Sequence, residues 1–374
     1  MKFIANKEEL LKNLTVADSI INIKSPLAIL LNLYIEVFPD GNMIILSFNG
    51  ENGVRVESNA IVEEPGKAIL LSKKLLEIIR KIPNDRVVFR SNPENENEII
   101  IHPEVEENPK FTIFSMPVDS YPVFNEFNWS NYIRMSQETL LEQISCTDYT
   151  VSTDPSKPAF TGIYIEESIE GYLTFVASDG KRLAYITRPY EEKIGQVKLS
   201  VIIPEKIFKT IKNILKTGDA LFSIQNQAFF KIGNVYIFSN LVEGKFPSYK
   251  DVIPKERNNV VRVNSEIFLN AIDIVSVMSD PDTGIIIFNI DNNIMKIYTS
   301  HNILGEAKEI INIEYKGSPI TISVNHKSLT DFLRTVLGKD IEFVINSQVS
   351  PVLLKSINDD NYIYICMPIK IHDW

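Results

Sequence analysis

The segment "VASDGKRLAYI", residues 176–186, gathers a serine, an aspartate, a lysine and an arginine within five consecutive positions. As a nucleophile, Ser178 would need a base such as histidine, and none lies near it in the sequence, so only a distant one could serve. Strand-like runs of alternating side chains lie on both sides of Asp179-Gly180. An Asp-Gly pair between two strands strongly favours a β-hairpin, because glycine adopts positive φ. The segment therefore predicts a hairpin that presents residues 181–183 at its edge. A hydrolase that uses Ser178 and Asp179 is the alternative.

Outside this segment, the sequence offers little that could perform catalysis. The four histidines are scattered, and none has the spacing of a metal-binding pair. The chain has no GxxxxGK[ST] phosphate-binding loop, no GxGxxG dinucleotide motif and no GxSxG nucleophile motif. The acidic pairs Asp280/Asp282 and Asp359/Asp360 lack a third ligand at a suitable spacing. We therefore predict no catalytic residues, no metal and no cofactor.

Length and composition are those of an ordinary globular protein. The chain has 374 residues, which suggests two or three domains, and its net charge of −10 argues against a surface that is basic throughout. No apolar run reaches the roughly 18 residues of a membrane span. The charged N-terminal segment does not resemble a signal peptide. Cys146 and Cys366 have neither metal-binding spacing nor a disulfide pattern, which predicts reduced thiols and a cytoplasmic location.

A helical pattern recurs three times along the chain, as expected for repeated domains. It occurs in "KEELLKNL" (7–14), "QETLLEQI" (137–144) and "SEIFLNAI" (265–272). Each copy has apolar residues at its fourth, fifth and eighth positions, which predicts a helix with one apolar stripe. Each copy also follows a short extended segment. The regular spacing of the three copies indicates an internal repeat.

A second set of segments recurs with nearly the same period, at 68–82, 199–215 and 320–337. Each predicts a strand followed by an amphipathic helix, with Ser72 and Asn325 as suitable N-caps. Alternating β-rich runs lie between the two helical sets. A repeat of roughly 120 residues with two helices and many short strands predicts an α+β protein of three similar domains. We place these domains at residues 1–124, 128–252 and 258–374.

Basic residues gather on the solvent side of the second-set helices. They are Lys73, Lys74, Arg80 and Lys81 in the first copy, Lys206, Lys209, Lys212 and Lys216 in the second, and a thinner set, Lys327, Arg334 and Lys339, in the third. Such faces could follow the phosphate backbone of a nucleic acid without reading its sequence, and this binding would weaken with salt. A face that is merely solvated is the alternative.

Four blocks of sequence, "TDPSKPAFTGIYIE", "VASDGKRLAYIT", "LVEGKFPSYKDVIP" and "YICMPIKI", resemble the signature blocks of the bacterial sliding clamp family, the β subunit of DNA polymerase III. The resemblance implies a head-to-tail homodimeric ring of DNA-clamp domains, three per chain, with helices lining the inside and antiparallel sheets outside. It implies a non-catalytic processivity factor that encircles double-stranded DNA and tethers polymerase subunits, the clamp loader and repair proteins. A repeat-built protein-binding scaffold that does not encircle DNA is the alternative.

The resemblance also implies a hydrophobic cleft between the second and third domains, into which partner proteins insert short linear peptides. The matching residues are Phe160, Ser178, Gly180, Lys181, Arg182, Leu183, Pro247, Val252, Pro351, Ile365, Cys366, Met367, Pro368 and Ile369. Leu183, Met367 and Pro368 would form apolar walls. Lys181 and Arg182 would hold polar or C-terminal groups of the peptide.

Two residues of this expected cleft depart from the family pattern. Lys181 stands where the family commonly has histidine, and Phe160 is larger than the usual aliphatic residue. In addition, His372, Asp373 and Trp374 extend past the usual end of the family and are expected to form a flexible terminus.

Further residues match positions that the family uses for DNA and for its subunit joint. Lys24 and Lys157 match positions that contact the DNA backbone, and the helix lysines and Arg80 would join them. At the joint, the first domain of one chain would meet the third domain of its partner. The corresponding residues are Phe111 in the first domain and Ile272, Val277 and Met278 in the third.

Overall fold

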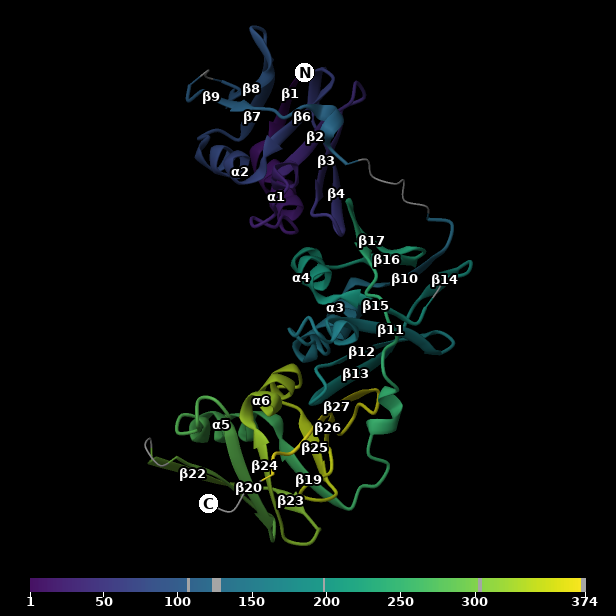
Figure 1. Cartoon of the computed structure of the whole chain (residues 1–374), viewed down its shortest axis with the longest axis vertical. Coiled ribbons are helices and arrows are strands. Elements are labelled where there is room, and N and C mark those ends of the chain that lie inside the picture. Colours follow the sequence, from purple (N-terminus) through teal and green to yellow (C-terminus); the bar gives the residue numbers. More distant parts are fainter. Residues whose placement is uncertain (106–107, 123–128, 198, 302–304, 371–374) are drawn as a thin grey trace. The chain divides into compact units, whose positions relative to one another are not determined.

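The computed structural model describes residues 1–105, 108–122, 129–197, 199–301 and 305–370 (Figure 1). The terminal residues His372, Asp373 and Trp374 therefore lie outside the described residues. The chain forms two compact units. The first comprises Met1–Leu140, Tyr190–Lys198 and Lys206–Leu241, and the second comprises Leu141–Pro189, Leu199–Glu205 and Val242–Trp374.

The repeated helical patterns form α-helices in the described part of the chain. These helices are α1 (Lys7–Asp18), α2 (Ser72–Lys81), α3 (Gln137–Ser145), α4 (Glu205–Ile214), α5 (Ser265–Ser276) and α6 (His326–Thr335). Asn325 caps α6 as predicted, because its side chain accepts hydrogen bonds from the backbone N–H of Lys327 and Ser328. The prediction for Ser72 is wrong: Leu71 occupies the N-cap of α2, and the Ser72 hydroxyl donates to Asp18 Oδ1 at 2.5 Å.

The first unit contains two antiparallel sheets. The smaller has the order β5 (Ile61–Glu64), β1 (Lys2–Asn6), β7 (Arg86–Asn92), β8 (Asn95–Pro103), β9 (Phe111–Phe114). The larger has the order β14 (Glu192–Ile194), β10 (Tyr132–Ser136), β16 (Asp219–Ile224), β17 (Gln227–Ile232), β18 (Val235–Asn240), β4 (Asn52–Asn59), β3 (Asn42–Phe48), β2 (Asn32–Val37), β6 (Gly66–Leu71). Pairing of β18 with β4, in the register Val235 opposite Val56, makes the larger sheet continuous between two sequence repeats.

The second unit is built in the same way. Its larger sheet has the order β15 (Val201–Pro204), β11 (Gly162–Ile169), β12 (Tyr172–Ser178), β13 (Arg182–Pro189), β27 (Tyr362–Cys366), β26 (Val352–Ser356), β25 (Asp340–Ile345), β19 (Asn259–Asn264), β23 (Glu314–Tyr315). Its smaller sheet has the order β22 (Gly305–Asn312), β21 (Ile294–His301), β20 (Ile285–Asp291), β24 (Ile320–Asn325). Here β13 pairs with β27, with Leu183 opposite Ile365, so residues far apart in sequence meet at the end of the 176–186 hairpin.

Aromatic side chains join the helices to the sheets. In the first unit, Phe208 of α4 meets Phe230 of β17 with ring centroids 6.0 Å apart. In the second unit, Phe268 of α5 meets Phe288 of β20 at 5.8 Å. Burial of each such side chain contributes roughly 1.5–3 kcal/mol to folding. This recurring arrangement of helix on antiparallel sheet confirms the predicted α+β class.

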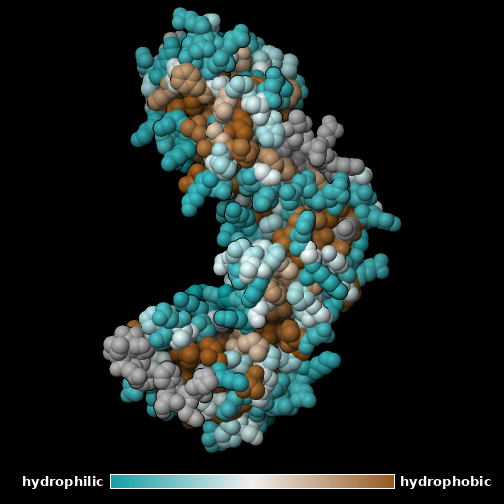
Figure 2. Space-filling model, viewed as in Figure 1, coloured by the Kyte–Doolittle hydropathy of each residue, from teal (hydrophilic) through white to brown (hydrophobic). Residues whose placement is uncertain are grey.

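The described helices are too short to cross a membrane, and the face seen in one direction is mostly polar (Figure 2). The face seen in Figure 2 is largely hydrophilic, with hydrophobic residues in separate patches. The longest helices, α1 and α5, have 12 residues each, and no described helix combines the length and hydrophobicity that a membrane crossing needs.

Candidate functional site

The 176–186 segment is a β-hairpin, as predicted. Strands β12 and β13 pair with Ser178 opposite Leu183, and Gly180 in the turn has φ +89°. The Asp179 carboxylate accepts hydrogen bonds from the backbone N–H of Lys181 at 2.8 Å and of Arg182 at 2.9 Å. The Ser178 hydroxyl donates to the backbone carbonyl of Arg182 at 2.8 Å. The polar side chains that resembled a catalytic group therefore hold the turn in shape.

The tip of this hairpin lines a cavity of about 220 Å³ in the second unit. The lining residues are Phe160, Ser178, Gly180, Lys181, Arg182, Leu183, Phe246, Pro247, Ser248, Tyr249, Val252, Pro351, Ile365 and Met367. The structure therefore brings together the cleft residues expected from the sequence, except Cys366, Pro368 and Ile369. They converge from β12, β13, β27, the turn of the hairpin and loop segments of the second unit.

The walls of the cavity are mainly apolar, and their side chains pack closely against one another. Leu183 and Ile365 are buried in its floor, and Val252 and Met367 remain about half exposed at its mouth. Phe160 packs edge-on against Phe246, with ring centroids 5.8 Å apart. Its large ring is therefore accommodated by contact with a second aromatic ring. The cavity thus offers fixed apolar walls with accessible apolar side chains at the entrance, a form suited to apolar peptide side chains.

Phe246, Ser248 and Tyr249 line the cavity but were not predicted. They lie in the same "FPSYKDV" stretch as Pro247 and Val252, and the concentration of aromatic residues there was the available signal. The Tyr249 hydroxyl donates to Glu166 Oε1 at 2.7 Å. Burial, together with this carboxylate, raises the pKa of Tyr249, so the phenol stays neutral and keeps its hydrogen bond.

Cys366, Pro368 and Ile369 do not line the cavity. Successive residues of a strand point to opposite faces, so Cys366 turns away from the side that Ile365 occupies. Its side chain is buried, and this burial raises the pKa of the thiol to about 12. After the strand, the Ile369 N–H donates to the Ser323 carbonyl at 2.8 Å, which directs residues 368–369 toward β24.

The Arg182 guanidinium forms its hydrogen bonds within the protein and does not present a free charge at the entrance of the cavity. Its Nε donates to Asp179 Oδ2 at 3.0 Å, its Nη1 to Asp331 Oδ2 at 2.6 Å and its Nη2 to the Tyr149 carbonyl at 2.7 Å. Only 18% of its side chain is exposed. Arg182 therefore ties β13 to α6 and to the turn at Asp148–Thr150, and it positions the neighbouring Leu183.

Two lysines supply positive charge at the entrance of the cavity. Lys181 is exposed and belongs to the lining. Lys157, which the sequence suggested for DNA, lies beside the same hairpin: a Cβ atom added to Gly180 would be 3.9 Å from Lys157 Nζ and 4.0 Å from the Phe160 ring. The structure thus places Lys157 next to the cleft.

The other residues expected to contact DNA lie on the surface of the first unit. Lys24 is exposed after α1, Lys73, Lys74 and Arg80 are exposed on α2, and on α4 Lys206 and Lys209 are exposed and Lys212 is half-buried. On α4 they lie opposite the buried Ile207, Phe208 and Ile211, as the helical spacing predicts. Lys74 Nζ also pairs with Glu77 at 2.6 Å, which reduces its availability.

The residues expected at a subunit joint differ in exposure. Phe111 is half-buried on β9, the last strand of the smaller sheet in the first unit, and the neighbouring Phe114 is 72% exposed. Val277 at the end of α5 is 76% exposed and Met278 is half-buried. The expectation for Ile272 is wrong, because it is fully buried in the stripe of α5 that faces its own core.

Comparisons with known proteins agree with these observations. The repeated pairs of helices on antiparallel sheets define a protein built from successive similar α+β repeats. Family models described as the N-terminal, central and C-terminal domains of the DNA polymerase III beta subunit match residues 1–125, 134–248 and 250–370. The chain therefore belongs to the DNA polymerase III beta subunit family, and a hydrolase built on Ser178 is not what this family provides.

Relatives and solved structures span the chain from end to end. The beta sliding clamp of Synechococcus elongatus is 24% identical, covering 99% of this chain and 100% of that protein. The sliding clamp of Bacillus subtilis superimposes with a TM-score of 0.94 at 22% identity, over 100% of both chains. The sliding clamp of Pseudomonas aeruginosa bound to griselimycin superimposes with a TM-score of 0.91 at 24% identity, over 99% of this chain and 100% of that one.

Proposed function

We propose that this chain is a DNA sliding clamp that encircles duplex DNA as a homodimeric ring and tethers polymerase subunits, a clamp loader and repair proteins. The partners would bind through short linear peptides in the cleft at the 176–186 hairpin. We further propose cytoplasmic action and domain limits of 1–124, 128–252 and 258–374. Family membership, the cleft and the basic helix faces support this proposal.

The cleft is the observation that carries the proposal. Its floor is formed by Leu183 and Ile365 on paired strands, so its shape is fixed before a ligand arrives. Preformed apolar pockets bind with less loss of conformational entropy than mobile surfaces. Met367 and Val252 at the mouth would close over the apolar side chains of a peptide, and Lys157 and Lys181 would attract its acidic groups or C-terminal carboxylate.

DNA binding would rest on the basic faces of α2 and α4. Because the whole chain carries a charge of −10, such faces confine positive charge to a part of the surface. Lysine side chains without base-reading elements contact phosphates and impart no sequence specificity. This is the type of contact that a clamp needs if it is to move along duplex DNA.

The ring joint would form between the edge of β9 in one chain and the end of α5 in its partner. A terminal strand offers unpaired backbone groups for association, and Phe111, Phe114 and Val277 add apolar surface. Met278 would lie at the margin of this contact, and Ile272 would support it from the core.

A peptide titration tests the proposed cleft. A fluorescent peptide of the Gln-Leu-x-x-Leu-Phe type is titrated with the native protein, Leu183→Asp and Met367→Ala, and anisotropy is recorded. Saturable binding to the native protein that both variants weaken is expected. Ile169→Ala removes an exposed apolar side chain of β11 and serves as the matched control. Absence of binding to the native protein, or equal binding by Leu183→Asp, would refute the proposed cleft.

A further inference from the structure

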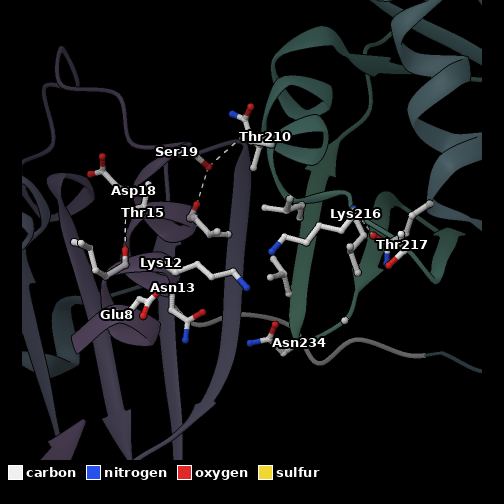
Figure 3. A pocket seen from close by; sticks show the side chains of 18 residues that line it. Glu8, Lys12, Asn13, Thr15, Asp18, Ser19, Thr210, Lys216, Thr217 and Asn234 are labelled. Atoms are coloured by element: carbon white, nitrogen blue, oxygen red, sulfur yellow. Dashed lines mark hydrogen bonds between the residues drawn. The ribbon is translucent and has the colours of Figure 1, made fainter. Parts of the chain in front are cut away.

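A second cavity, in the first unit and separate from the peptide cleft, has a volume of about 710 Å³ (Figure 3). Its walls come from α1, from the start of α3, from α4 and the segment that follows it, and from the turn between β17 and β18 with the adjoining strand ends. This volume is within the range of sites for small ligands. Of the residues proposed for DNA, Lys216 lines it, and none of those proposed for the peptide cleft or for the subunit joint does.

Two lysines point into this cavity from opposite walls. Figure 3 shows Lys12 of α1 and Lys216, just after α4, extending toward one another across the opening. Within the described residues, neither ammonium group forms an ion pair. Like charges that face one another repel, so an anion placed between them would be attracted by both. Two convergent ammonium groups are a suitable receptor for a phosphate group.

The carboxylates at the cavity, Asp18 and Glu8, form no ion pair with Lys12 or Lys216 in the described part of the chain. Asp18 accepts the hydroxyl hydrogen bond of Ser72 at 2.5 Å. Glu8 lies one turn before Lys12 on α1 and forms no ion pair with either lysine. A ligand with more than one negative charge would therefore bind more strongly than a monoanion, because it must compete with these two acids.

The walls that carry the lysines are held in place by hydrogen bonds. The backbone N–H of Lys216 donates to Gln137 Oε1 at 2.7 Å, and Gln137 Nε2 donates to the Asp219 carbonyl at 3.1 Å. On the other side, the Ser19 hydroxyl donates to Thr210 Oγ1 at 3.3 Å and joins the end of α1 to the middle of α4. The two lysines thus project from a fixed framework, which lowers the entropy cost of binding.

The remaining lining mixes five apolar side chains with polar ones, among them Asn13, Thr15, Asn213, Thr217 and Asn234. The apolar residues of the lining are Leu11, Val16, Ile214, Ile232 and Val235. A bare inorganic anion would leave these side chains without a partner, whereas a ligand with an apolar or aromatic body would cover them.

We propose that this cavity binds a small organic polyphosphate, with its phosphates between Lys12 and Lys216 and its apolar body against Leu11, Val16 and Ile214. Such a ligand would bridge α1 and the end of α4 and would stabilise the first unit against unfolding. The proposal concerns a site apart from the peptide cleft and does not depend on the proposed function.

Calorimetry with ATP as the probe tests this proposal, and tripolyphosphate, adenosine and a 12-base-pair DNA duplex serve as comparison ligands. ATP is expected to bind the native chain and to raise its melting temperature. Tripolyphosphate should bind more weakly and adenosine more weakly still. Lys12→Gln and Lys216→Gln should each weaken ATP binding about tenfold, as expected for the loss of one charge-assisted hydrogen bond.

Control variants separate this site from general electrostatic attraction. Lys73→Gln with Lys74→Gln removes two exposed lysines of α2 that do not line the cavity, and ATP binding should be unchanged. Lys12→Arg and Lys216→Arg keep the positive charge. Each should therefore retain most of the ATP affinity that the corresponding glutamine variant loses. The proposal is overturned if ATP does not bind, if the α2 control loses as much affinity, or if only the duplex binds and depends on Lys12 and Lys216.

Discussion

Removal of the Asp331 carboxylate should loosen the floor of the peptide cleft. Asp331→Ala takes away the acceptor of the 2.6 Å hydrogen bond from Arg182, whose side chain is only 18% exposed. A hydrogen bond to a charged group is worth about 1.5–3 kcal/mol. Arg182 keeps Asp179 and the Tyr149 carbonyl as partners. We therefore expect the free energy of unfolding to fall by about 2 kcal/mol, toward the lower end of that range.

This loss should be visible in thermal unfolding and in peptide affinity. For a domain of 150–250 residues, 1 kcal/mol corresponds to about 2–4 °C, so the transition of the second unit should fall by roughly 4–8 °C. Peptide affinity should fall as well, because Arg182 positions Leu183. Asp331→Asn keeps an acceptor and should lose less, and Asp282→Ala, at an exposed aspartate elsewhere in the second unit, should change neither quantity. An Asp331→Ala protein that melts like the native chain and binds peptide equally well would refute this role of Arg182.

Three further predictions concern the joint, the DNA-binding face and the buried thiols. If the proposed homodimer forms, Val277→Asp should convert it to monomers, as measured by light scattering, because a carboxylate would be placed in an apolar joint. Lys206→Glu with Lys209→Glu should weaken binding to a short duplex and reduce the slope of log affinity against log salt by about two. Burial raises the pKa of Cys146 and Cys366 from 9.0 to about 12, so the unfolded chain ionises first and stability is lost as pH rises from about 9 to about 12. Replacement of both cysteines by alanine should reduce the drop in melting temperature between pH 8.5 and 10.5.

Each of these predictions has a control and a contradicting result. Ile169→Asp, at an exposed site on β11, should leave the dimer intact; an unchanged mass for Val277→Asp would rule out α5 as part of the joint. Lys255→Glu with Lys316→Glu adds the same negative charge away from α4, and an equal loss of DNA binding there would show that net charge alone is responsible. An identical pH dependence with and without the thiols would show that other groups cause the alkaline loss of stability.

Local features of the fold were predictable because short-range interactions determine them. The Asp179-Gly180 turn follows from the positive φ that glycine accepts, and the cap at Asn325 follows from its side-chain acceptor. The two helices per repeat follow from apolar spacing. The same spacing also indicates that Ile272 is buried, because it is the eighth residue of "SEIFLNAI" and lies on the apolar stripe that faces the core. This position is therefore unsuited to a surface joint.

Long-range features were not predictable from local patterns. The acceptor of Arg182 on α6 lies 149 positions along the chain, so its structural role emerges only from the folded arrangement. The continuous sheet through β18 and β4 likewise joins segments from different repeats. The family resemblance indicated which segments form the cleft. Strand alternation determines that Ile365 faces the cavity and Cys366 does not, and packing brings Phe246 and Tyr249 into the lining.

Retention on circular DNA tests the central claim, a ring around duplex DNA, most directly. The protein is loaded onto a nicked circular plasmid with a bacterial clamp loader and ATP, washed in high salt to remove electrostatic contacts, and quantified before and after the plasmid is cut once. A ring should survive the salt wash on the circle and leave when the DNA is linearised. Loss in the wash, or equal retention on linear and circular DNA, would contradict encirclement.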